Sequence, residues 1–186
     1  MVIDGYMHIL IGDHQMPIHQ LSAVVATSLF GGQFKHLKKM KFPVEEMWMC
    51  PVNVGAHWIL VIVNMSDKVL VVMDPKGNEG HHACKLLRNW RNFLRITDFG
   101  DKGATWTVQT MQHNKQQDSS SCGILVLRQF ADDYLRYGDI SDVQTSPRAV
   151  HQARLHVATA LLQCKKGMQR TSVWCAPLPK KMQMRA

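Results

Sequence analysis

The sequence lacks the features of a membrane-spanning or secreted protein. None of its apolar runs approaches the roughly 20 residues that cross a bilayer, and no basic segment followed by an apolar core opens the chain. Its five cysteines are odd in number and include no Cys-x-x-Cys pair, which argues against a disulfide framework and favours a reducing compartment. We therefore expect an intracellular protein of the nucleus, the cytoplasm or both, with no membrane contact.

Acidic residues are missing from the C-terminal part of the chain. The whole sequence has 22 Lys and Arg residues against 14 Asp and Glu residues, yet residues 143–186 contain basic residues and no acidic one. Residues 167–186 also show little apolar periodicity and contain two prolines, so we expect a basic, disordered tail there. Such a tail is either a solvated extension or a contact for nucleic acid. We expect no segment of the chain other than this tail to bind nucleic acid.

The length and the apolar pattern predict one domain of mixed structure. The chain has 186 residues, of which 46% are apolar, enough for one ordinary core, and no linker or repeat divides it. We expect a monomer, with a single domain at residues 1–166 and the tail at residues 167–186. The periodicity predicts helices at 2–11, 20–30, 80–96, 122–137 and 147–164, and strands at 47–53, 59–64, 69–73 and 105–109. This combination is typical of an α+β fold.

One cysteine lies at the start of an expected helix. Residues 116–123 read Gln-Gln-Asp-Ser-Ser-Ser-Cys-Gly, and apolar residues at helical spacing follow Cys122 as far as Gly138. The free amide groups and the macrodipole at a helix start favour a thiolate. An isolated cysteine beside apolar residues is more often an inert core side chain, so a reactive role for Cys122 requires a base and an orienting group.

A histidine and an aspartate flank an expected hairpin. His57 precedes the strand at 59–64, and Asp74 follows the returning strand at 69–73. Antiparallel strands bring their outer ends together, so the two side chains can be neighbours. Each also has an ordinary alternative, as a strand-edge histidine and as a turn former before Pro75. Together with Cys122 they make a thiol, a base and an orienting carboxylate.

The order and spacing of these residues resemble the ubiquitin-like-specific (sentrin-type) cysteine proteases, which process and remove SUMO and related modifiers. The resemblance covers residues 1–165 and rests on His57-Trp58, on Asp74 seventeen positions later, and on Gln116 six positions before Cys122. It implies a papain-like α+β fold in which helices flank a central mixed or antiparallel sheet.

The resemblance also implies roles for five residues and a substrate. Cys122 would be the nucleophile, His57 the general base and acid, and Asp74 the residue that orients His57. Gln116 would donate to the oxyanion, and Trp58 would lie over the Gly-Gly tail of the substrate and exclude larger side chains. The implied reaction is cleavage after the C-terminal Gly-Gly of SUMO or a related ubiquitin-like modifier, with that modifier and its conjugates as partners.

We expect no metal and no cofactor. His81, His82 and Cys84 are the strongest candidates for metal ligands, but they share one helix turn and cannot all face one ion.

Two features separate this chain from the pattern of the family. It starts after the point at which members usually carry a Trp-Leu-Asn/Asp segment, and Ser121 stands directly before Cys122 where many members have an aspartate. Asp118 lies three residues further upstream. Two alternatives to a protease therefore stay open: a catalytically weak module of the same fold that binds such modifiers, and an accessory domain that contacts nucleic acid through the basic tail.

Overall fold

The computed structural model describes residues 2–14, 17–42, 45–97, 99 and 105–170. Within these ranges, three consecutive strands form the antiparallel centre of a sheet and four helical elements follow one another at the end of the chain, which confirms the predicted α+β class. The helical elements are α1 (Val2–Gly12), α2 (Ala23–Phe30), the 3₁₀ turn η1 (Leu37–Lys39), α3 (Glu79–Thr97), α4 (Cys122–Ile124), the π-helix η2 (Leu125–Ala131), α5 (Asp132–Tyr137) and α6 (Pro147–Arg170). The strands are β1 (Ile18–Gln20), β2 (Met47–Asn53), β3 (Trp58–Asn64), β4 (Val69–Met73) and β5 (Thr107–Thr110).

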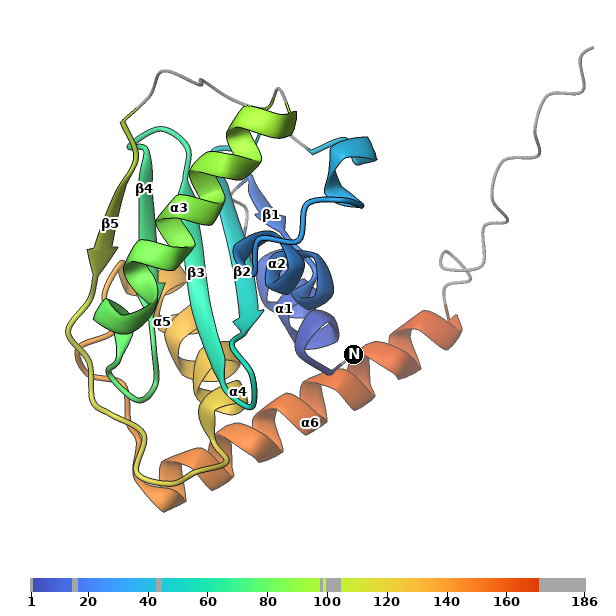
Figure 1. Cartoon of the computed structure of the whole chain (residues 1–186). Coiled ribbons are helices and arrows are strands. Elements are labelled where there is room, and N and C mark those ends of the chain that lie inside the picture. Colours follow the sequence, from blue (N-terminus) through green and yellow to red (C-terminus); the bar gives the residue numbers. More distant parts are fainter. Residues whose placement is uncertain (1, 15–16, 43–44, 98, 100–104, 171–186) are drawn as a thin grey trace, which may run out of the picture.

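The described strands form one mixed sheet in the order β1-β2-β3-β4-β5 (Figure 1). The three central strands are antiparallel to one another, whereas β1 and β5 pair in parallel at the two edges. The hairpin predicted from the sequence joins β3 to β4, and Asn64 pairs with Val69 at its closed end. Lys68 completes the turn with a positive φ of 57°.

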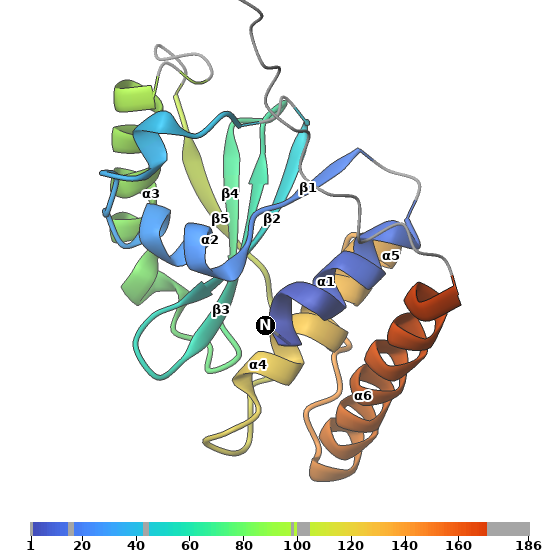
Figure 2. The same ribbon diagram turned by 90° about the vertical axis from the view of Figure 1, so that its right-hand side faces the viewer.

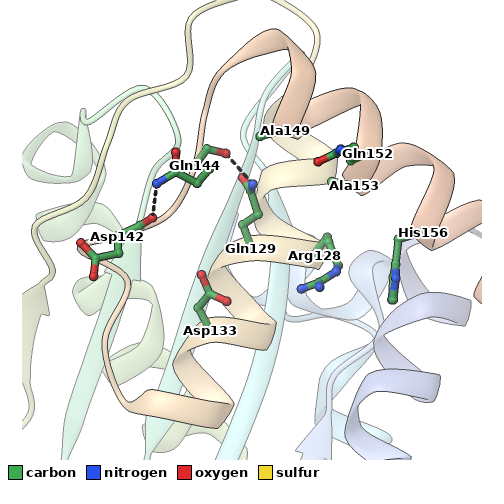
Figure 3. Close-up of a pocket in the computed structure, with 9 residues that line it drawn as sticks. All are labelled: Arg128, Gln129, Asp133, Asp142, Gln144, Ala149, Gln152, Ala153 and His156. Carbon is green, nitrogen blue, oxygen red and sulfur yellow. Dashed lines mark hydrogen bonds between the residues drawn. The ribbon is translucent and has the colours of Figure 1, made fainter.

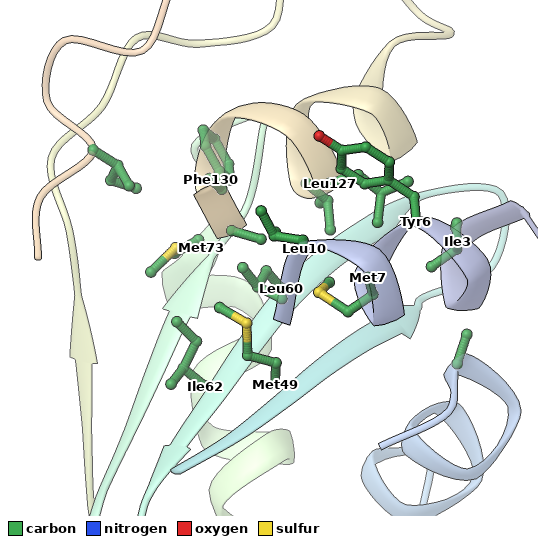
Figure 4. Close-up of a cluster of buried hydrophobic side chains, with 14 of the residues drawn as sticks. Ile3, Tyr6, Met7, Leu10, Met49, Leu60, Ile62, Met73, Leu127 and Phe130 are labelled. Atoms are coloured by element: carbon green, nitrogen blue, oxygen red, sulfur yellow. The ribbon is translucent and has the colours of Figure 1, made fainter. Parts of the chain in front are cut away.

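Helices cover both faces of the sheet, so the central strands are buried on both sides (Figure 2). Alternate residues of β3 therefore enter two different cores. Leu60 and Ile62 belong to the first core, which lies under α1 and η2 (Figure 4), and Val157 of α6 adds to the same core. Ile59, Val61 and Val63 belong to the second core, under α2 and α3. This two-sided burial explains why β3 has a continuous apolar sequence rather than an alternating one.

The helix predicted at residues 122–137 is present as three consecutive helical segments. The short helix α4 begins at Cys122, the π-helix η2 follows, and α5 ends at Tyr137. Gly138 stops it with a left-handed φ of 68° and donates its N–H to the Tyr134 carbonyl, so the predicted end is confirmed. The π-helical stretch was not predicted because apolar periodicity over seven residues does not distinguish a π-turn from an α-turn.

Several boundaries differ from the prediction. Strand β1 was missed because its three residues are too few for a periodic pattern, and α2 begins only at Ala23, after Ser22 caps it. Helix α6 continues to Arg170, past the predicted end at residue 164, because polar residues can extend a helix without apolar periodicity. Residues 167–170 of the expected tail are thus helical, and its remainder, 171–186, lies outside the described residues. Among the described helices, none has both the length and the apolar character of a membrane span.

Candidate active site

His57 and Asp74 meet at the open end of the central hairpin. The Nε2 atom of His57 lies 2.6 Å from Oδ1 of Asp74, and the Asp74 side chain is completely buried. The same Oδ1 accepts the backbone N–H of Lys76 at 2.8 Å, which fixes the carboxylate. The neighbourhood expected from the hairpin pattern is therefore present.

The register of the hairpin explains this contact. Leu60 pairs with Met73, so one further step along the ladder sets Asp74 opposite Ile59. His57 lies two residues beyond Ile59 and shares its face, which makes His57 and Asp74 diagonal neighbours. Trp58 lies between His57 and Ile59 in sequence, so its side chain projects to the opposite face of the sheet, where it packs against the first core.

The second ring nitrogen of His57 is positioned to accept a proton. A 2.6 Å contact between Nε2 and a carboxylate requires the proton of the neutral ring on Nε2, which leaves the lone pair on Nδ1. Nδ1 is buried and has no hydrogen-bond partner within the described residues. This is the arrangement that a general base needs.

Cys122 begins α4, and the start of that helix lies against β3. A Cβ atom built on Gly123 would lie 3.5 Å from Cδ1 of Trp58, so the residue after Cys122 lies in van der Waals range of the residue after His57. Cys122 as a residue is only 6% exposed. The structure therefore brings Cys122, His57, Trp58 and Asp74 to one end of the sheet.

Two other cysteines of the described chain have different surroundings. Cys50 is fully buried in the second core, and burial strongly raises the pKa of its thiol. Cys84 is exposed on α3. Neither residue lies at a helix start beside the His57–Asp74 pair.

Gln116 is attached to the same end of the sheet through its backbone. Its N–H donates to the Pro75 carbonyl at 2.6 Å, directly after Asp74. Its side-chain Nε2 donates to the Asp118 carbonyl at 2.6 Å and lies 3.1 Å from Asp118 Oδ1, whereas its Oε1 is buried without a hydrogen-bond partner within the described residues. The oxyanion role of Gln116 thus stays a prediction.

Sequence reasoning missed several residues that surround the predicted ones. Nε2 of His82 lies 3.5 Å from Asp74 Oδ2, and burial lowers the pKa of His82 while the Asp74 carboxylate opposes that shift. Glu79 accepts the Asp74 N–H at 3.1 Å and contacts His113 Nε2 at 2.6 Å. His113 lies 34 residues from Glu79 in sequence, so no local pattern indicates this contact.

Two neighbouring surface cavities lie at or near the His57–Asp74 pair, and a third lies away from it. A cavity of about 400 Å³ borders His57 and Asp74, and a neighbouring one of about 520 Å³ shares Val54, His81 and His82 with it. A third hollow, of about 380 Å³, lies between η2 and the first turns of α6 (Figure 3). Polar and charged side chains such as Arg128 dominate its lining, and none of the five predicted site residues borders it.

The described residues contain no group of three or more His, Cys, Asp or Glu side chains arranged to hold a metal ion.

Known proteins match this chain in sequence. Rat (Rattus norvegicus) sentrin-specific protease 2 is 26% identical over 142 residues, which cover 68% of this chain and 24% of that protein. Human (Homo sapiens) sentrin-specific protease 5 is 24% identical over 110 residues, which cover 56% of this chain and 14% of that protein. The chain therefore spans about a quarter or less of the length of these relatives.

Solved structures match its fold. The C-terminal Ulp1 protease domain in complex with Smt3, the yeast orthologue of SUMO, aligns with a TM-score of 0.66 at 16% identity and covers 87% of this chain and 75% of that one. A structure described as the de-sumoylating protease aligns with a TM-score of 0.64 at 13% identity, covering 93% and 84%. These similarities establish an Ulp1-like α+β fold.

A family model decides the classification. The model of the Ulp1 protease family, C-terminal catalytic domain, matches residues 31–144, which include the hairpin, the loop before α4 and the whole helical stretch from Cys122. The family agrees with the resemblance carried by His57, Asp74 and Cys122. The chain belongs to the Ulp1 protease family.

Proposed function

We propose that this protein is a cysteine protease that cleaves after the C-terminal Gly-Gly of SUMO or a related ubiquitin-like modifier, both in precursors and in conjugates. The observation that carries the proposal is the buried His57–Asp74 pair, 2.6 Å apart, at the end of the sheet where α4 begins with Cys122. Membership of the Ulp1 protease family supports the same chemistry.

In the proposed first step, His57 Nδ1 takes the proton of the Cys122 thiol. The sulfur attacks the carbonyl carbon of the last glycine, and the π electrons of that carbonyl move onto its oxygen. The Cys122 backbone N–H and the Gln116 side-chain amide stabilise the oxyanion. The carbonyl then reforms, the C–N bond breaks, and His57 gives its proton to the departing amine.

In the second step, water removes the modifier. His57 accepts a proton from water, and the hydroxide adds to the thioester carbonyl. The carbonyl then reforms as the C–S bond breaks, His57 returns its proton to the Cys122 sulfur, and the carboxyl group of the modifier loses its proton to solvent. Asp74 stabilises the His57 imidazolium that exists in both steps and keeps its ring in one orientation.

Trp58 supplies the proposed selectivity for glycine. Its ring lies against Gly123, next to the attacking thiol. An extended Gly-Gly segment fits in a narrow passage beneath an aromatic ring, whereas an added methyl group collides with it. The partner would therefore be a modifier that ends in Gly-Gly.

The test is a panel of linear fusions in which SUMO, other ubiquitin-like modifiers and ubiquitin each precede a short peptide. We expect mass spectrometry to find cleavage after Gly-Gly in at least one SUMO-type fusion, and none with Cys122→Ser. The proposal is contradicted if no fusion is cut, or if cleavage persists in Cys122→Ser.

One observation favours a second candidate, a module that binds modifiers with little catalysis. The Gln116 side-chain amide already donates to Asp118, so at most one of its two N–H bonds is left for an oxyanion. A binding module would retain a modifier without cutting it, and the same panel separates the two functions when binding is measured beside cleavage.

A further inference from the structure

A carboxylate organises the turn that precedes Cys122. Asp118 Oδ1 accepts the backbone N–H groups of Ser120 at 2.9 Å and Ser121 at 2.8 Å. Its Oδ2 accepts a short hydrogen bond from the Ser121 hydroxyl. Ser121 is 1% exposed and is the N-cap residue of α4, so this hydroxyl is buried directly beside the candidate nucleophile.

A cation from a distant helix contacts the same hydroxyl. The Nη2 atom of Arg154, on α6, donates to Ser121 Oγ at 3.1 Å and lies 3.5 Å from the Ser120 carbonyl oxygen. Arg154 is 33 residues from Ser121 in sequence and lies outside residues 31–144, the segment that matches the family model. The Ser121 hydroxyl thus donates a hydrogen bond to the Asp118 carboxylate and accepts one from the Arg154 guanidinium.

The candidate oxyanion donor joins the same network. Gln116 donates to the Asp118 carbonyl and lies within hydrogen-bond distance of its carboxylate. Asp118 therefore connects the residue expected to stabilise the oxyanion with the residue directly before the thiol. Both must hold their places within fractions of an ångström for attack to be productive.

We propose that Asp118 is a positioning residue of this active site, which together with Arg154 and the Ser121 hydroxyl fixes Cys122 and Gln116 relative to each other. The inference rests on the proposed function and adds to it a structural role for a residue upstream of the serine that replaces the usual aspartate. Asp118 acts on the reaction only through the groups that it holds.

The surroundings keep Asp118 ionised, as this role requires. The Ser121 hydroxyl, followed by the Ser120 and Ser121 amides and Gln116, lowers the pKa of the Asp118 carboxyl. The network therefore has its anionic acceptor at neutral pH and loses it only under acidic conditions.

The chain contains a matched control in Asp139. Its Oδ1 accepts the N–H groups of Ile140 at 2.7 Å and Ser141 at 3.1 Å, and its Oδ2 accepts the Ser141 hydroxyl at 2.6 Å. This turn repeats the chemistry of the Asp118 turn, but it follows α5, and the hydrogen bonds of the Asp139 side chain within the described residues go to Ile140 and Ser141 and to none of the predicted site residues. A variant at Asp139 therefore loses the same kind of turn without touching the site.

The experiment compares Asp118→Ala, Asp118→Asn, Arg154→Ala and Asp139→Ala in the full chain, using the modifier fusion that the parent cleaves best. We expect Asp118→Ala to lower kcat by roughly 10- to 100-fold with KM nearly unchanged, because a misplacement of about 1 Å can cost about 10²-fold. Asp118→Asn keeps an oxygen for the two amides and should recover part of the rate. Arg154→Ala should show a smaller loss, and Asp139→Ala none.

Hydrogen exchange of residues 116–124 supplies a readout that does not depend on activity. Asp118→Ala should accelerate exchange at the Ser120 and Ser121 amides, whose acceptor is lost. Unchanged exchange there would overturn the inference, even for a parent without activity. Parental kcat in Asp118→Ala, or an equal loss in Asp139→Ala, would overturn it as well. If the parent cuts no fusion but Asp118→Ala still accelerates exchange at Ser120 and Ser121, the proposed function is refuted and the hydrogen-bond network is not.

Discussion

The two sides of the candidate active site are held by different kinds of contact. His57 and Asp74 flank neighbouring strands, and the backbone ladder of the β3–β4 hairpin fixes their separation. Gln116 lies in the loop between β5 and α4, and Cys122 directly follows that loop, which is held by contacts of Asp118 and of Arg154 of α6.

This difference has a consequence for robustness. A backbone ladder survives most side-chain substitutions, because the hydrogen bonds that set the register come from the main chain. A loop held by a carboxylate and a guanidinium depends on particular side chains. We therefore expect substitutions around Cys122 to disturb alignment more easily than substitutions around the hairpin that carries His57.

The largest expected effect comes from removing the reactive group on either side, the Cys122 thiol or the His57 imidazole. Cys122→Ser and His57→Ala should each reduce kcat by roughly 10⁴- to 10⁶-fold, and the double variant should be no worse than the more damaging single one, because the two groups act as a unit. The measurement is the rate of fusion cleavage. Cys84→Ala, at an exposed thiol, is the control and should keep the parental rate. Additive losses would show that the thiol and the imidazole act independently.

Removing the candidate oxyanion donor, Gln116, from the loop before Cys122 should reduce kcat by a smaller factor. Gln116→Ala should reduce kcat by roughly 10²- to 10³-fold, since one oxyanion donor contributes about that much. Gln117, its neighbour in sequence, provides the control, and Gln117→Ala should change the rate little. Equal losses in the two variants would mean that the loop register assumed for the oxyanion donor is wrong.

Trp58 lies where the two sides meet, so its substitution tests selectivity rather than rate alone. Parent protein should cut substrates that end in Gly-Gly and reject those that end in Ala-Gly or Gly-Ala. Trp58→Ala should stay folded and lose part of this discrimination, measured as the ratio of kcat/KM values beside a thermal melt. If Trp58 serves only as core packing, the melt should instead show a loss of about 3–5 kcal/mol with the preference unchanged.

The smallest expected effect concerns pH on the hairpin side. Burial holds the pKa of His82 below its ordinary value, so unfolding lets this ring take up a proton in mildly acidic solution. Stability linked to His82 is therefore complete above its unfolded pKa of about 6.5 and decreases as the pH falls towards the folded pKa. His82→Gln should lessen the drop in Tm between about pH 7.5 and about pH 5.5, whereas His81→Gln, at an exposed neighbour, should not. An identical drop in parent and His82→Gln would contradict this assignment.

The same difference between the two sides explains what could be predicted from the sequence. The hairpin, and with it the His57–Asp74 contact, follows from two apolar runs and a turn, because strand pairing translates sequence order directly into neighbourhood. The helix after Cys122 and its stop at Gly138 follow from apolar spacing and a glycine.

Contacts across the fold could not be predicted in this way. Arg154 reaches Ser121 from α6, and His113 reaches Glu79 from the loop after β5, across more than 30 residues in each case. The sequence offers no periodicity that links such pairs. The acceptors of the Gln116 side-chain amide could not be predicted either, since they depend on how the turn at Asp118 folds back on the loop.

The site at which a modifier becomes attached tests most directly whether Cys122 is the nucleophile of a modifier protease. The parent chain is incubated with SUMO, other ubiquitin-like modifiers and ubiquitin that each carry an electrophile in place of the last glycine, and the adduct is mapped by peptide mass spectrometry. We expect one covalent adduct, at Cys122, with a modifier of the SUMO type, and much slower attachment in His57→Ala. An adduct at Cys84 or Cys50, or none with any modifier, would contradict this expectation.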